Sequence, residues 1–150
     1  MPKLLTEPFI QKRVISYLSE VKGFNKPVKP TGLREHGVDI KMKHKNCGWY
    51  FLVECKGDPS DNVKSPEGSR NSCMNSALGQ IITRMHRNGI RGYKYGYKYG
   101  IAFPVSFKKM ILRKMPFDVM DKLNLYLFFV NGIGNVEEID WKKLRDIKKK

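Results

Sequence analysis

Two short apolar segments in the first half of the chain each carry an acidic side chain at a position suited to chemistry. Asp39 lies at the start of the first segment, and Glu54 and Lys56 flank Cys55 at the end of the second. Residues two apart on a strand point to the same side, so Glu54 and Lys56 are expected to lie side by side. A carboxylate within an apolar strand is costly to bury unless another group compensates for its charge. The pattern therefore indicates a site that holds a cation.

A hairpin would bring the two acids together. Asn46-Cys47-Gly48 predicts a turn between the segments, with Asp39 near the end of one strand and Glu54 near the matching end of the other. Two clustered carboxylates repel each other unless a cation sits between them. Mg²⁺ prefers oxygen ligands and is the expected cofactor, with Mn²⁺ as a substitute. The alternative is that Asp39 ends a loop and that Glu54 and Lys56 pair across solvent, because the pattern is short and common.

A helix is expected to precede these strands. Thr6 is a good N-cap, Glu7 places an acid in the first turn, and Gly23 ends the element. Helical periodicity places Glu7 on the same side as the apolar residues, at the inner edge of a core-facing helix. These apolar residues recur at helical spacing and are Ile10, Val14, Tyr17, Leu18 and Val21.

The remaining segments alternate between strands and helices. A short edge strand with a loop is expected over 25–35, and strands over 38–43, 49–56, 99–103, 125–130 and 136–139. A helix is expected over 74–88 and a mostly helical stretch over 106–122, whereas 57–72 is interpreted as a mobile loop. This order predicts an α/β fold with a mixed central β-sheet flanked by helices on both faces. Residues 1–150 are expected to form a single domain with a basic C-terminal tail over about 141–150.

The charge of the chain points to a polyanionic partner. The formal net charge is +15, and so large an excess opposes compactness unless the natural partner is negatively charged. DNA, RNA and anionic membranes all fit, but no apolar run approaches the length needed to span a bilayer. The first residues lack the apolar core of a signal peptide, and the three cysteines form no CxxC pair. Neither a disulfide framework nor a zinc ribbon is expected, and a cytoplasmic location is predicted.

The two segments resemble the PD-(D/E)XK nuclease superfamily, which includes many restriction endonucleases and the archaeal Holliday-junction resolvases. Gly37-Val38-Asp39 stands where the family has Pro-Asp, and Glu54-Cys55-Lys56 stands for the second half of the motif. The proline is missing here, as it is widely replaced in the superfamily. The resemblance covers roughly residues 7–130 and includes the order of the elements, which implies a restriction-endonuclease-like core.

The resemblance also implies a role for each residue of the motif. Asp39 and Glu54 would hold Mg²⁺ together with the main-chain carbonyl of Cys55. Lys56 would position the attacking water and stabilise charge on the scissile phosphate. Glu7 matches an acid common near the start of the family's first helix, and it would hold a second metal ion or tune the first. A metal ion can both activate a water molecule and clamp phosphate oxygens, which are the two needs of phosphodiester hydrolysis.

Further residues are candidates for nucleic-acid binding. Gln80 matches a glutamine that many relatives place on the helix after the motif lysine, and Arg84 and Arg87 lie on the same stripe. The stripe would line a DNA groove, or it would be a solvated helix side. Lys94 and Lys98 belong to a tyrosine–lysine repeat that would stack bases and neutralise phosphates. The alternative for the repeat is a strand extension with aromatic cross-strand packing.

The sequence therefore predicts a Mg²⁺-dependent DNA endonuclease that acts as a homodimer, since two sites can then address two strands. One alternative is a Holliday-junction or other branched-DNA resolvase, and another is a noncatalytic nucleic-acid-binding protein that keeps the nuclease fold. No membrane partner and no small-molecule organic cofactor is expected. His36 is interpreted as a turn residue, Asp58 and Asp61 as surface residues, and the tail as a phosphate contact or a frayed helix.

Overall fold

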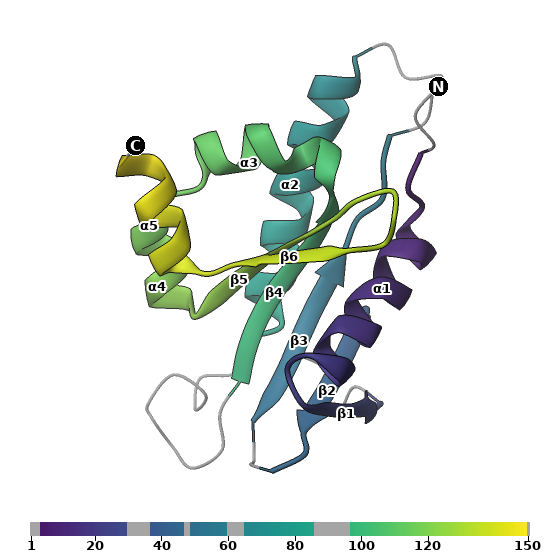
Figure 1. Cartoon of the computed structure of the whole chain (residues 1–150). Helices are drawn as coiled ribbons and strands as arrows, with labels where there is room; N and C mark the ends of the chain where they lie inside the picture. The colour runs from purple at the N-terminus through teal and green to yellow at the C-terminus, as the bar shows by residue number, and fades with distance from the viewer. Residues whose placement is uncertain (1–3, 30–36, 47–48, 60–64, 86–96, 150) are drawn as a thin grey trace.

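The computed structural model describes residues 4–29, 37–46, 49–59, 65–85 and 97–149. Within them, a six-stranded sheet has a strand order that follows the chain (Figure 1). Its strands are β1 (Phe24–Pro27), β2 (Ile40–His44), β3 (Tyr50–Cys55), β4 (Tyr97–Pro104), β5 (Leu125–Val130) and β6 (Val136–Ile139). The helices are α1 (Glu7–Glu20), α2 (Pro66–Thr83), α3 (Lys108–Lys114), α4 (Phe117–Leu123) and α5 (Trp141–Lys149), with a short 3₁₀ turn, η2 (Val105–Phe107).

The sheet is mixed, as predicted. The pairs β1–β2, β2–β3 and β5–β6 are antiparallel, whereas β3–β4 and β4–β5 are parallel. The parallel pairs are joined by crossovers that run through α2 and through η2, α3 and α4. Because β3, β4 and β5 run in one direction, their carboxyl ends meet at the same edge of the sheet. Ligands of α/β sheets commonly bind at such an edge.

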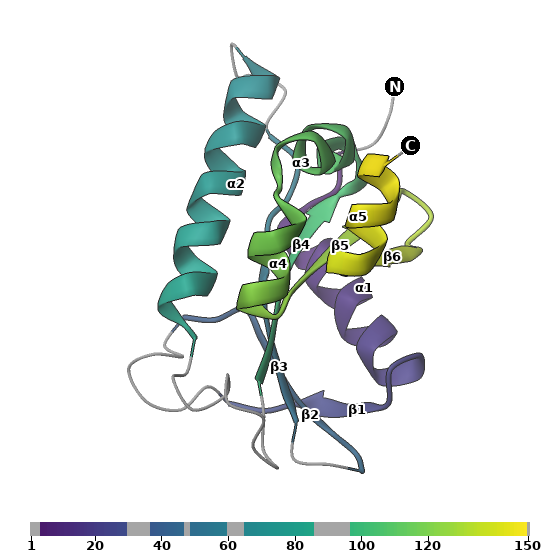
Figure 2. The same cartoon turned by 90° about the vertical axis from the view of Figure 1, so that its left-hand side faces the viewer.

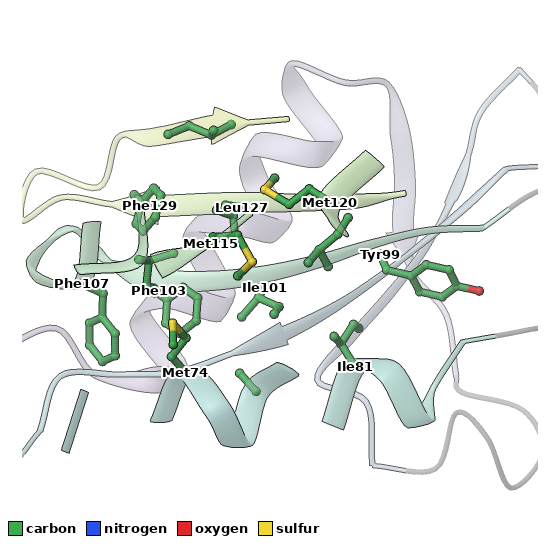
Figure 3. Packing of buried hydrophobic residues seen from close by; sticks show 14 of the residues in the cluster. Met74, Ile81, Tyr99, Ile101, Phe103, Phe107, Met115, Met120, Leu127 and Phe129 are labelled. Atoms are coloured by element: carbon green, nitrogen blue, oxygen red, sulfur yellow. The ribbon is translucent and has the colours of Figure 1, made fainter. Parts of the chain in front are cut away.

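Helices cover both faces of the sheet, which confirms the predicted layers. Helix α1 lies on one face, and α2 to α5 lie on the other (Figures 1 and 2). On the larger side, Met74 and Ile81 of α2 pack towards Ile101 and Phe103 of β4 (Figure 3). Burial of this apolar surface is the main favourable contribution to the fold, and it fixes α2 over β3 and β4.

Helix α1 begins where the capping signals predict. The Thr6 hydroxyl accepts a hydrogen bond from the Phe9 amide at 3.3 Å, and Glu7 is the first helical residue. Ile10, Val14 and Leu18 are fully buried against the sheet, as expected. Val21 was expected in the same stripe, but it follows the helix as its C-cap and is 66% exposed. Glu7 is also exposed, so it lies at the rim of the core and not at its inner edge.

Helix α2 starts at Pro66 and not at Met74, so the prediction of a mobile loop over 66–72 is wrong. The Ser65 hydroxyl accepts a hydrogen bond from the Gly68 amide at 3.1 Å, which makes Ser65 the N-cap. Proline at the next position is a common first residue of a helix. These start signals are present in the sequence, but the polar composition of the segment obscures them. The helix ends at Thr83, and the expected end at Gly89 lies outside the described residues.

The C-terminal segments are more ordered than the sequence suggests. The stretch over 106–122 divides into α3 and α4 because Pro116 cannot continue the first helix. The basic tail is not frayed: it forms α5, whose Leu144 is fully buried. Arg145 and Lys142 of this helix lie 5.2 Å and 5.7 Å from the centre of the Trp141 ring. None of the helices among the described residues has the length and apolar character needed to cross a membrane.

Candidate active site at the carboxyl end of β3

The predicted hairpin brings Asp39 and Glu54 to one point. Strands β2 and β3 pair antiparallel with Ile40 opposite Val53, so Asp39, which precedes β2, lies beside Glu54 near the end of β3. Tyr50 to Cys55 form a strand that is almost wholly buried, and Glu54 within it is only 2% exposed. The local cause is the run of apolar residues around Glu54, which draws the strand into the centre of the sheet.

Two hydrogen bonds hold Asp39 in place. Its carboxylate oxygen Oδ2 accepts from the Cys55 amide at 2.7 Å, and its main-chain carbonyl accepts from Gln11 Nε2 at 2.8 Å. The first bond ties Asp39 to the end of β3, and the second ties it to α1. Gln11 was not singled out in the sequence, although it lies one helical turn after Glu7 and therefore on the same side of α1.

The pKa of Glu54 is raised to about 7, chiefly by burial. The negative charge of Asp39 and a side-chain hydrogen bond with Asp39 also raise this pKa, whereas Arg84 and Lys56 lower it. Two carboxylates that share a hydrogen bond need a proton between them, because like charges at such close range cannot both be ionised easily. Beside Asp39, Glu54 therefore holds its proton to a higher pH than an exposed glutamate does.

Lys56 and Glu7 complete the charged cluster around the end of β3. Burial raises the pKa of Glu7, the Asp39 carboxylate raises it further, and the Lys56 ammonium lowers it. Burial also raises the pKa of the Cys55 thiol, with further contributions from the three carboxylates and an opposing one from Lys56. Asp39 and Lys56 each act on both Glu7 and Glu54, so both acids lie within electrostatic reach of Asp39 and Lys56.

Gly57 permits the close approach of α1 to the end of β3. A Cβ at Gly57 would lie 2.6 Å from the backbone nitrogen of Glu7 and 3.1 Å from the Leu5 carbonyl oxygen. Both of these atoms belong to the backbone, so they cannot turn aside as a flexible side chain would. The absence of a side chain at Gly57 therefore allows Glu7 to lie next to the strand that carries Glu54 and Lys56.

Gly57→Ala is expected to destabilise the protein by about 1–3 kcal/mol, because the added methyl group overpacks a backbone contact. Gly79→Ala is the matched control, since a Cβ there has no atom within 4 Å and the residue lies inside α2. The free energy of unfolding of the control is expected to rise by about 0.5–1 kcal/mol, because alanine has a higher helix propensity than glycine. Denaturant unfolding measures both values. Equal effects of the two substitutions would mean that α1 does not depend on Gly57 for its position.

Asp58 is a structural residue and not the surface residue that the sequence suggested. Its carboxylate accepts hydrogen bonds from the Leu5 amide at 2.8 Å and from the Ser106 hydroxyl, and its own amide donates to the Leu5 carbonyl at 2.8 Å. Asp58 thus links the segment before α1 to the turn after β4. Asp61 and His36 lie outside the described residues.

Arg84 lies on the acidic pair instead of on an open helix side. It follows α2 as the C-cap residue, and its Nε lies 3.4 Å from Glu54 Oε1. The Arg84 side chain is 18% exposed and also donates from Nη1 to the Thr83 hydroxyl at 3.1 Å. Within the described residues, neither Arg84 Nε nor Glu54 Oε1 has a hydrogen-bond partner, so their contact is electrostatic. Arg84 therefore compensates part of the buried negative charge.

The donor atoms at this point fit a hard divalent cation. Glu54 Oε1 is a buried carboxylate oxygen that accepts no hydrogen bond from the part of the chain that the structure describes, and Asp39 lies beside Glu54. No three His, Cys, Asp or Glu side chains gather closely enough to hold a metal ion in the described part of the chain. A metal here would consequently depend on Asp39, Glu54, a main-chain oxygen such as that of Cys55, and water or phosphate oxygens. That combination is usual for Mg²⁺, which keeps several waters when it binds to proteins.

The other predicted contact residues are dispersed. Gln80 is half-buried on α2, and its buried Oε1 has no hydrogen-bond donor among the described residues. Lys98 lies 5.3 Å from the centre of the Tyr126 ring and 5.9 Å from that of Trp49. Arg87 and Lys94 lie outside the described residues.

The described end of the tyrosine–lysine repeat is a strand extension. Tyr97 of β4 stacks on Tyr50 of β3, with ring centres 5.5 Å apart, and on Tyr99 at 6.4 Å. This is the aromatic cross-strand packing that was considered as an alternative to base stacking. Tyr99 is 1% exposed, so its ring is part of the core.

No protein-family model matches the chain, and no curated protein matches its sequence. Among solved structures, the chain is similar to the crystal structure of an XisH family protein from Nostoc punctiforme, with a TM-score of 0.54 and 14% sequence identity. The match covers 88% of this chain and 99% of that chain. At this level of identity, the likeness shows the α/β fold and carries no assignment of individual residues.

Proposed function

We propose that the protein is a metal-dependent DNA endonuclease that hydrolyses phosphodiester bonds. The observation that carries the proposal is the pairing of Asp39 with Glu54, a 2% exposed carboxylate within an apolar strand, beside Lys56. Retaining a buried acid in this position costs stability, and perturbed acids of this kind concentrate at functional sites. The PD-(D/E)XK resemblance of the same three residues supports the same conclusion.

Each candidate residue would have its own role in hydrolysis. Asp39 and Glu54 would hold Mg²⁺ with the Cys55 carbonyl, and Glu7 would tune the site from the start of α1. When bound there, Mg²⁺ supplies an activated nucleophile at neutral pH and stabilises charge on the phosphate oxygens. The Lys56 ammonium adds a positive charge where negative charge develops on the phosphate.

Two observations favour a nucleic-acid substrate. The net charge of +15 favours a polyanion, and the candidate acids lie at the sheet edge where ligands of α/β folds commonly bind. A branched-DNA resolvase would use the same residues, so only the shape of the preferred DNA separates it from a linear-duplex endonuclease. A noncatalytic binding protein would have no need of the buried Glu54. The homodimer and the cytoplasmic location stay predictions.

Cleavage is expected to require Mg²⁺ or Mn²⁺, whereas Ca²⁺ should support binding without turnover. Plasmid DNA and a four-way junction, each incubated with every metal and with EDTA, provide the measurement. Nicking or linearisation in Mg²⁺ that stops with EDTA supports the proposal. Full activity in excess EDTA contradicts the metal mechanism, and binding without cleavage under any metal supports the noncatalytic alternative.

Lys56→Ala is expected to lower the rate about a hundredfold to a thousandfold with little change in DNA affinity, because its charge matters mainly in the transition state. Single-turnover rates in Mg²⁺ and anisotropy in Ca²⁺ separate the two quantities. Lys122→Ala, at an exposed position at the end of α4, is the control for the loss of one positive charge. If Lys56→Ala weakened binding in proportion to rate, Lys56 would be one more phosphate contact.

A further inference from the structure

A trough leads away from the candidate active site along the first half of α2. Its first part has a volume of about 580 Å³ and is lined by Gly57 and Asp58, the residues that follow Lys56. Its second part, of about 530 Å³, is lined by residues of the start of α2 and of α3. These two helices lie on the same face of the sheet (Figure 2). Ser65 and Gly68 line both parts, so the two adjoin at the start of α2.

The second part of the trough is strongly positive. Arg70 of α2 and Lys109, Arg113 and Lys114 of α3 line it, against the single acid Glu67. Cations gathered around one cleft repel each other, and an anion within the cleft relieves that repulsion. The excess is therefore more easily explained by a ligand with several negative charges than by packing.

Carboxylates of the described residues do not form ion pairs with these cations. Lys114 donates to the neutral side-chain oxygen of Asn71, and no carboxylate of the described residues pairs with it. In the parts of the chain that are described, no carboxylate lies within ion-pair distance of Arg70, Lys109 or Arg113. Among the described residues, the buried Nε of Arg70 has no hydrogen-bond acceptor, and the Arg70 side chain lines the trough.

The position of the trough connects it to the proposed chemistry. Its first part is lined by Gly57 and Asp58, which follow Lys56 directly after the end of β3. The N-terminus of α2, an 18-residue helix, faces the shared part of the trough and adds a partial positive charge there. A strand of nucleic acid with one phosphate at Lys56 would have its neighbouring phosphates close to this positive wall.

We infer that the trough holds the phosphodiester backbone of the DNA next to the cleaved phosphate, with Arg70, Lys109, Arg113 and Lys114 as its phosphate contacts. This inference rests on the proposed function for its geometry, since the trough is placed relative to the candidate active site. It gives the binding role to α3 and to the start of α2, and not to the stripe of Gln80, Arg84 and Arg87 that was one of two interpretations from the sequence. The contacts act on phosphates and therefore carry no sequence preference.

The double substitution Lys109→Ala/Arg113→Ala tests the assignment, because both side chains are exposed and the fold does not depend on them. The control is Lys26→Ala/Lys122→Ala, which removes the same charge from exposed positions on β1 and α4. Anisotropy of a labelled DNA duplex in Ca²⁺, over a series of salt concentrations, gives the slope of log affinity against log salt. Each lost phosphate contact reduces the magnitude of that slope by about 0.9. The slope of the trough variant should therefore be smaller by about two, and the slope of the control should not change.

The outcomes keep this inference separate from the proposed function. Equal slopes for the trough and control variants would overturn it, even if the wild-type protein cleaves DNA. A slope lower by about two would support it, even if no cleavage occurs in Mg²⁺ and the nuclease proposal fails. Loss of binding to an RNA duplex with no loss on DNA would also overturn it, as would a wild-type protein that does not bind DNA.

Discussion

Asp39→Asn is expected to reduce DNA cleavage by about a thousandfold or more while leaving the fold unchanged. Asparagine keeps a side-chain oxygen that can accept the hydrogen bond from the Cys55 amide, which Asp39 Oδ2 accepts at 2.7 Å. The substitution therefore removes a charge and little else. Loss of about 4 kcal/mol of transition-state stabilisation, a reasonable amount for a metal ligand, corresponds to that factor in rate.

The affinity of Asp39→Asn for DNA should be equal to that of the wild type or higher, because one negative charge near the phosphate is lost. Asp121→Asn on the exposed side of α4 is the matched control and should retain full activity. Single-turnover rates in Mg²⁺ and anisotropy in Ca²⁺ measure the two effects. A fully active Asp39→Asn protein would mean that the site of cleavage lies elsewhere.

The centre of the candidate site was predictable because local rules determine it. Alternation along a strand puts Glu54 and Lys56 on one side, and a hairpin register then places Asp39 beside Glu54. Both rules involve only short sequence separations. The same reasoning predicted β5 and β6 with the bounds that the structure shows, since their apolar runs are flanked by turn residues.

The contacts that the sequence did not reveal all join segments far apart in the chain. Arg84 reaches Glu54 because the apolar face of α2 packs over β3 and β4, and periodicity within α2 cannot specify that crossing. Asp58 was taken for a surface residue because its partners, Leu5 and Ser106, are 53 and 48 residues away. Such pairings follow from the packed core, which a pattern of local spacings does not define.

The start of helix α2 was not predicted from the sequence for a different reason. Its start at Ser65 carries the usual signals, but the following residues are small and polar, which is the composition of a loop. Tertiary packing of Met74, Ala77 and Ile81 stabilises the whole helix, including the first turns, which have few apolar residues. The positive wall of the trough depends on those first turns, and it therefore became visible only with the structure.

Glu54→Gln is expected to make the metal-free protein more stable at neutral and alkaline pH. The pKa of Glu54 is raised from 4.5 to about 7, so the folded state retains a proton that the unfolded state has already released. Below about pH 4.5 both states are protonated and the carboxyl group imposes no penalty. As pH rises towards 7, the free energy of unfolding of the wild type falls by up to about 3 kcal/mol, and that of the glutamine variant does not. This amount follows from about 1.4 kcal/mol for each pH unit of the pKa difference.

Denaturant unfolding from pH 4 to 8 measures the effect as a gap between the two proteins that widens with pH. Glu137→Gln is a control with the opposite pH dependence, because a hydrogen bond from Lys108 lowers the pKa of Glu137. The ionised Glu137 therefore stabilises the folded protein at neutral pH, and this stabilisation is lost on acidification. Saturating Mg²⁺ should remove the difference in free energy of unfolding between the wild type and Glu54→Gln. The metal stabilises the ionised carboxylate of the wild type and binds the glutamine amide only weakly. Parallel pH profiles for wild type and Glu54→Gln would show that Glu54 is ionised at little cost. The argument that a buried, cation-seeking acid marks the site would then fail.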